Sequence, residues 1–74
     1  MSRHNQHIVT HPRGWAVRAE NGTRATSVHR TQAAAIDRGR AIATAQRTEL
    51  VIHGQDGRIR ARDSHGTDPN PPKG

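Results

Sequence analysis

The chain has 74 residues, with 12 Lys or Arg against 6 Asp or Glu, so its formal net charge at pH 7 is +6. It contains no cysteine, and its one aromatic residue is Trp15. The lack of cysteine excludes disulfides and thiolate metal ligation. The short length and the low apolar content allow one domain with a thin aliphatic core. The charge favours a polyanion such as DNA or RNA as partner, although arginine enrichment can also produce a surface that is only solvated.

Apolar runs are too short to cross a membrane, and the N-terminal residues lack the apolar core of a signal peptide. We therefore expect a cytoplasmic protein with no membrane partner.

A first β-hairpin is predicted over residues 6–20. Residues 6–10 are rich in β-branched side chains, and residues 15–20 alternate with Trp15 and Val17 on one side. Between them, His11-Pro-Arg-Gly14 supplies the residues that turns prefer.

A turn at Asn21-Gly22 precedes residues 23–29, in which Val28 is the one large apolar side chain. This segment is predicted to form either a short edge strand or an irregular crossing.

A helix is predicted from Gln32 to about Gln46, because Thr31 is a good N-cap and the segment is alanine-rich and free of proline. Gly39 lies on its apolar side, which indicates close approach of the helix to the sheet. The residues at the spacing of one helical face are Ala35, Ile36, Gly39, Ile42, Ala43 and Gln46.

A second hairpin is predicted over residues 49–63, with a two-residue turn at Asp56-Gly57. Strict alternation places Leu50, Ile52, Ile59 and Ala61 on one face, and Arg58, Arg60 and Arg62 on the other.

The predicted fold class is α+β, with a hairpin, a helix and a hairpin that form one helix on a four-stranded antiparallel sheet. The domain spans residues 6–63, between a flexible N-terminus at residues 1–5 and an extended Pro/Gly-rich tail at residues 64–74. The predicted core consists of Ile8 or Val9, Trp15, Val17, Ile36, Ile42, Leu50, Ile52 and Ile59.

Nearly the whole chain resembles the bacterial and phage family known as domain of unknown function 2188. The matching segments are Gly14-Trp-Ala-Val17, Thr31 with Ala34-Ala-Ile36, Glu49 to Ile59 with its His-Gly-x-Asp-Gly-x-Ile block, and the ending from Asp68 to Gly74. The resemblance implies a compact strand-strand-helix-strand-strand domain and implies no activity.

The arginines of residues 58–62 are the candidate functional feature. Period-two spacing puts them roughly 6.6–6.8 Å apart on one strand face, which is suited to successive phosphates. The hypothesis is a non-enzymatic module that binds nucleic acid through Arg18, His53, Arg58, Arg60 and Arg62. The alternatives are a solvated face that discourages aggregation and a protein-interaction module that completes its thin core as a homodimer.

No metal, cofactor or small-molecule site is predicted. His4, His7 and His11 lack the ligand spacing of zinc sites, and we interpret them as exposed polar residues. The sequence also lacks a phosphate loop, a nucleophile elbow and a pair of carboxylates, so we expect no catalysis.

Overall fold

The computed structural model describes residues 4–64, which form five strands and one helix. The predicted tail at residues 65–74 and the first three residues lie outside the described part. Within that part, no helix has the length and apolarity to cross a membrane. In chain order the elements are β1 (Gln6–His11), β2 (Gly14–Ala19), β3 (Ala25–His29), α1 (Gln32–Gln46), β4 (Glu49–His53) and β5 (Ile59–Ser64).

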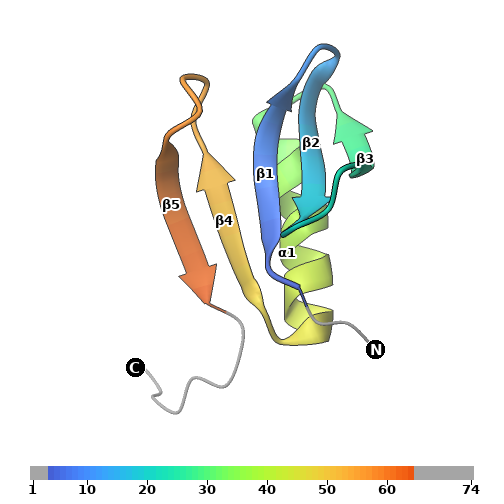
Figure 1. The fold of residues 1–74 in the computed structure, drawn as a ribbon, viewed down its shortest axis with the longest axis vertical. Helices are drawn as coiled ribbons and strands as arrows, with labels where there is room; N and C mark the ends of the chain where they lie inside the picture. The colour runs from blue at the N-terminus through green and yellow to red at the C-terminus, as the bar shows by residue number, and fades with distance from the viewer. Residues whose placement is uncertain (1–3, 65–74) are drawn as a thin grey trace.

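The sheet has the strand order β3-β2-β1-β4-β5, with α1 across one face (Figure 1). The α+β class is confirmed, but the prediction of a four-stranded antiparallel sheet is wrong. Residues 25–29 form a fifth strand at one edge, and β1 pairs with β4 in parallel.

The direction of β4 follows from the presence of β3. After three antiparallel strands, the chain leaves the sheet at the end opposite to its start. The 15 residues of α1 span about 22 Å, comparable to the roughly 20 Å of a six-residue strand. The helix therefore returns the chain to the end at which β1 began, and β4 runs parallel to β1.

The first hairpin and the helix agree with the predictions. Ile8 lies opposite Val17, and Pro12 and Arg13 connect β1 to β2. The hydroxyl of Thr31 accepts a hydrogen bond from the Ala34 amide at 3.1 Å, which caps α1.

Asn5 is held in place, although the sequence assigns it to a flexible N-terminus. Its side-chain oxygen accepts a hydrogen bond from the Glu49 amide at 3.0 Å, and its carbonyl accepts one from the Glu20 amide at 2.8 Å. The start of the domain is thus tied to both β2 and β4.

The core lies between α1 and strands β1, β2 and β4. Its buried residues are Ile8, Val17, Ala35, Ala43, Leu50 and Ile52, with Trp15, Ile36 and Ile42 packed partly buried against them. Most of the predicted core is confirmed, but Ile59 is 50% exposed.

A β-bulge in the second hairpin explains the exposure of Ile59. Ala61 pairs with Ile52 and Ile59 pairs with His53, so Arg60 is the extra residue and has no cross-strand partner. Because one extra residue reverses the alternation, Ile59 joins His53 on the sheet face away from α1. We call this the outer face; its members on the inner strands are His7, Val9, Ala16, Arg18, Val51 and His53.

The turn of this hairpin is also longer than the predicted two residues. Residues 54–58 connect β4 to β5, the Gly57 amide donates to the Gly54 carbonyl at 3.0 Å, and Gly57 has φ +86°.

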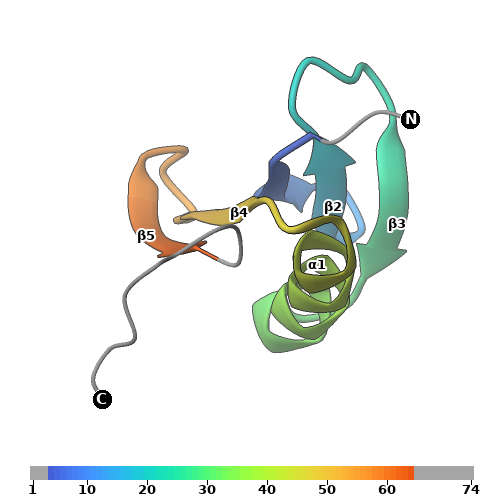
Figure 2. The ribbon, with the colours of Figure 1, turned by 90° about the horizontal axis from the view of Figure 1, so that it is seen from below.

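Strand β5 lies beyond the part of the sheet that α1 covers (Figure 2). Two side-chain bridges connect it to the helix. Arg40 donates to Asp63 at 3.0 Å, and Arg60 donates to Gln32 at 3.3 Å.

The close approach of α1 to the sheet at Gly39 generates the first testable prediction. A Cβ atom at this position would lie 2.7 Å from Ile8 Cδ1 and 2.8 Å from Leu50 Cδ1. We expect Gly39→Val to lower the free energy of unfolding by about 2–3 kcal/mol through overpacking, as measured by urea denaturation. The exposed Ala41→Val in the same helix is the control and should cost less than about 0.7 kcal/mol. Equal losses would contradict close packing at Gly39.

Candidate functional site

The predicted binding residues do not form one row in the structure. Arg58 precedes β5 and lies in the connecting loop, and Arg60 bonds to Gln32 on the helix side. Arg62 lies opposite Val51 on the outer face, where its guanidinium is 3.8 Å from Glu49. The prediction that the three arginines share a face is wrong, because the bulge at Arg60 interrupts the alternation.

The other two predicted residues, Arg18 and His53, do lie on the outer face. Arg18 is opposite His7 in the pairing of β1 with β2. The outer face also carries two carboxylates. Glu20 is 3.0 Å from His7 Nε2, and Glu49 is the carboxylate near Arg62. Positive and negative side chains therefore alternate here, and the face does not form a continuous cationic surface.

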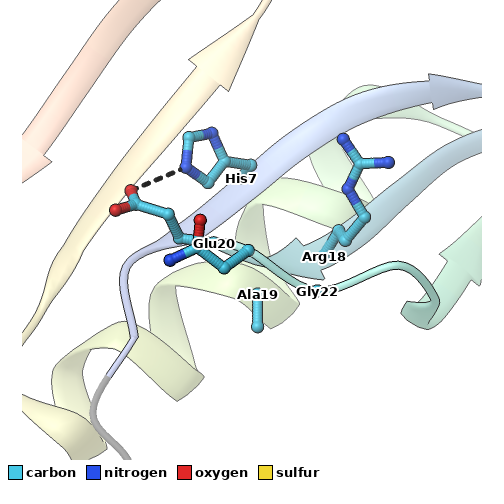
Figure 3. A pocket seen from close by; sticks show the side chains of 6 residues that line it. His7, Arg18, Ala19, Glu20 and Gly22 are labelled. Carbon is cyan, nitrogen blue, oxygen red and sulfur yellow. Dashed lines mark hydrogen bonds and ion pairs between the residues drawn. The ribbon is translucent and has the colours of Figure 1, made fainter.

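A chain of hydrogen-bond contacts crosses the outer face from Glu20, the residue after β2, to the β4–β5 loop. Glu20 Oε1 lies 3.0 Å from His7 Nε2, and His7 Nδ1 lies 2.9 Å from His53 Nε2. His53 Nδ1 in turn lies 3.3 Å from the carbonyl oxygen of Gly57. Figure 3 shows the His7 ring directed at Glu20, while the guanidinium of Arg18 points elsewhere.

The number of N–H donors limits how many contacts of this chain are hydrogen bonds at one time. Its two ends, the Glu20 carboxylate and the Gly57 carbonyl, are both acceptors. Three hydrogen bonds thus need three N–H groups from two imidazoles, but a neutral imidazole supplies one. Two neutral imidazoles therefore supply the donors for two of the three contacts at one time.

A shallow pocket of about 270 Å³ lies beside this chain. Both nitrogens of His7 already have partners, so its ring has no nitrogen left for a ligand or for general-base chemistry. Among residues 4–64, no group of three or more His, Cys, Asp or Glu side chains is arranged to hold a metal ion. The lining residues are His7, Arg18, Ala19, Glu20, Asn21 and Gly22.

Sequence reasoning missed His7 as the partner of His53, and Glu20 as the partner of His7. His7 and His53 are 46 residues apart, and they meet because β1 and β4 are parallel neighbours. Alternation did place His53 on the outer face, but a chain predicted as four antiparallel strands gives no reason to bring His7 beside it.

A second arrangement gathers arginines at one end of the sheet. The β1–β2 turn, the start of α1 and the β4–β5 loop all lie at this end, which we call the loop end (Figure 1). It comprises residues 12–13, 30–32 and 54–60. Gly14 packs so closely on the backbone of residues 29–30 that its Cβ would lie 3.0 Å from Arg30 Cα. The charged residues of the loop end are Arg13, Arg30, Arg58, Arg60 and Asp56.

The hydrogen bonds to Glu20 generate a prediction on pH dependence. The bond from His7, and next the bond from Asn5, hold the pKa of Glu20 below its ordinary value of 4.5. A carboxylate with a lowered pKa stabilises the fold above its unfolded value, and this contribution disappears as the pH falls through the folded value. We expect the urea midpoint of the wild type to fall more than that of Glu20→Gln between about pH 6 and about pH 3.

The control for this prediction is a double-mutant cycle with His7→Gln. The second substitution should have a smaller effect in the Glu20→Gln background than in the wild type, because the contact between the two side chains is already weakened. Parallel pH profiles for the wild type and Glu20→Gln would contradict the role of Glu20.

Comparisons with known proteins agree with the resemblance noted in the sequence. Residues 6–65 match the family model described as "Uncharacterized protein conserved in bacteria (DUF2188)". The chain is 34% identical over 62 residues to the uncharacterized protein YdaT of Bacillus subtilis (strain 168), a match that covers 84% of this chain and 41% of that protein. The chain thus spans less than half the length of this relative. No solved structure matches the chain. The chain belongs to the family of uncharacterized bacterial proteins DUF2188.

Proposed function

We propose that the protein is a non-enzymatic module that binds nucleic acid through its loop end. The observation that carries the proposal is that three separate segments at one end of the sheet bring four arginines and one carboxylate to that end (Figure 1). Clustered arginines neutralise phosphates and release counterions, and this effect dominates the affinity of most nucleic-acid-binding proteins.

The contacts of these arginines leave their charges available to phosphate. Arg58 lies 3.9 Å from Asp56, but the two side chains are 88% and 66% exposed, and such surface pairs contribute little. Arg60 donates to the neutral amide of Gln32, so its charge is not cancelled there. Asp56 accepts a hydrogen bond from the Arg58 amide at 3.1 Å, which gives this carboxylate a structural role in the turn.

The loop end is a better candidate interface than the outer face. On the outer face, Arg62 and His7 each have a carboxylate within 4.0 Å. Of the residues predicted from the sequence, Arg58 and Arg60 belong to the loop end, which adds Arg13 and Arg30. Arg18, His53 and Arg62 lie outside it.

Contacts to phosphates fit this surface better than contacts to stacked bases. Base stacking needs exposed aromatic side chains, whereas Trp15 packs against the core. We therefore favour binding that depends on backbone charge and shows little preference for base sequence.

Salt dependence tests the proposal directly. If each of the four arginines neutralises one phosphate of duplex DNA, the logarithm of the binding constant falls with that of the salt concentration at a slope of roughly −3.6. The slope is obtained from fluorescence anisotropy of a labelled duplex titrated at several salt concentrations. The Arg13→Ala/Arg30→Ala variant should reduce the slope to about −1.8.

The matched control is Arg24→Ala/Arg38→Ala, which removes the same charge from the β2–β3 connection and the middle of α1. We expect this variant to keep a slope of about −3.6. Absence of binding at low salt, or equal effects of the two double variants, would overturn the proposal.

A further inference from the structure

The two edges of the sheet differ in how they are protected. An edge strand presents backbone groups that can pair with another chain, and charged side chains discourage this. Strand β5 carries Arg60, Arg62 and Asp63, whereas β3, with the sequence ATSVH, carries no Asp, Glu, Lys or Arg. The edge at β3 is therefore the more open of the two.

The side chains of β3 suit the addition of another strand. Ala25, Thr26 and Val28 are exposed, and Val28 at 39% is one of two large apolar side chains exposed among residues 4–64. Val28 lies opposite Ala16, a buried residue of the outer face. A strand added beside β3 would cover Val28 and extend this small apolar surface.

Both ends of β3 are marked by arginine. Arg24 immediately precedes the strand and Arg30 immediately follows it, and both are exposed. In the described part of the chain, neither has a carboxylate within 4.0 Å. Between them β3 contains a β-bulge, because Val17 pairs with Ser27 and Arg18 pairs with Ala25, which leaves Thr26 without a partner on β2.

These arginines disfavour a second copy of this chain as the occupant. A two-fold antiparallel pairing of β3 centred on Ser27 would place Arg24 of one copy opposite Arg30 of the other, at both ends of the ladder. Like charges directly opposite each other destabilise a strand pair. A strand with an acidic residue at each of its ends would instead form an ion pair with each arginine.

We propose that β3 is a docking edge for an extended acidic peptide. The peptide adds antiparallel to β3, its backbone pairs with that of residues 25–29, and one carboxylate at each end of the paired segment meets Arg24 or Arg30. The central residues between the carboxylates are small or β-branched, as on β3 itself. Backbone pairing supplies the affinity and the two arginines select the sequence.

The test is an NMR titration of the ¹⁵N-labelled protein with the peptide Glu-Thr-Val-Thr-Val-Thr-Glu. We expect chemical-shift changes that cluster on the amides of residues 24–30 and slower hydrogen exchange along β3. Two control peptides separate charge from strand pairing. One has Lys in place of both Glu residues, and the other keeps Glu and has Pro in place of the central Thr, which removes a backbone donor.

Replacing both arginines by glutamate tests whether Arg24 and Arg30 are the residues that select the charge of the peptide. In Arg24→Glu/Arg30→Glu the preference should invert, so that the Lys peptide binds more tightly than the Glu peptide. Two exposed ion pairs correspond to roughly a 2- to 30-fold preference in each direction. Circular dichroism verifies that the variant is folded. If the variant does not fold, the comparison of the Glu, Lys and Pro peptides on the wild type still tests the proposal.

Three outcomes would overturn the proposal. The first is equal affinity of the wild type for the Glu, Lys and Pro peptides, and the second is a set of shifts centred away from β3. The third is a dimer of the protein alone in which the β3 amides are already protected, which would make a second copy the occupant.

Discussion

The contact of Gly39 with Ile8 and Leu50 holds the two halves of the molecule together. Ile8 belongs to β1 and Leu50 to β4, and the parallel pairing of these strands joins the β1-β2-β3 sheet to the β4-β5 hairpin. This pairing has three residue pairs in its register, so it depends on the helix that packs across it. A Cβ atom at position 39 would lie within 3.0 Å of the Cδ1 atoms of Ile8 and Leu50, so the helix or these two buried side chains would have to shift.

The direction of this junction decides which functional groups meet. Because β1 and β4 are parallel, and each begins a hairpin, the loops of both hairpins lie at the same end of the sheet. Arg13 from one loop and Arg58 from the other are thereby brought to the loop end. On the opposite side of the sheet from Gly39, the same junction places His7 beside His53 and completes the hydrogen-bond chain to Glu20.

In the second hairpin, the alternation of apolar and polar residues predicts the core residues correctly in β4 and incorrectly in β5. Leu50 and Ile52 are buried as their alternation predicts, and Gly57 has the positive φ expected of the turn. The bulge at Arg60 leaves no mark in the hydrophobic pattern, because Ile59 and Ala61 alternate with arginines whether or not a residue is unpaired. One extra residue then exposes Ile59 and separates Arg60 from Arg62. Register depends on the partner strand and on the turn, and neither is encoded in the alternation of one strand.

The sequence by itself determined the elements whose causes are local. The Thr31 cap, the stripe of α1, the first hairpin and the need for a small residue at Gly39 all follow from spacing and residue type within a few positions. Only the tertiary structure decided the strand order, the direction of β4 and the grouping of charges. Those features depend on β3 reversing the chain once more before the helix, and on contacts such as His7 with His53 that join residues 46 positions apart.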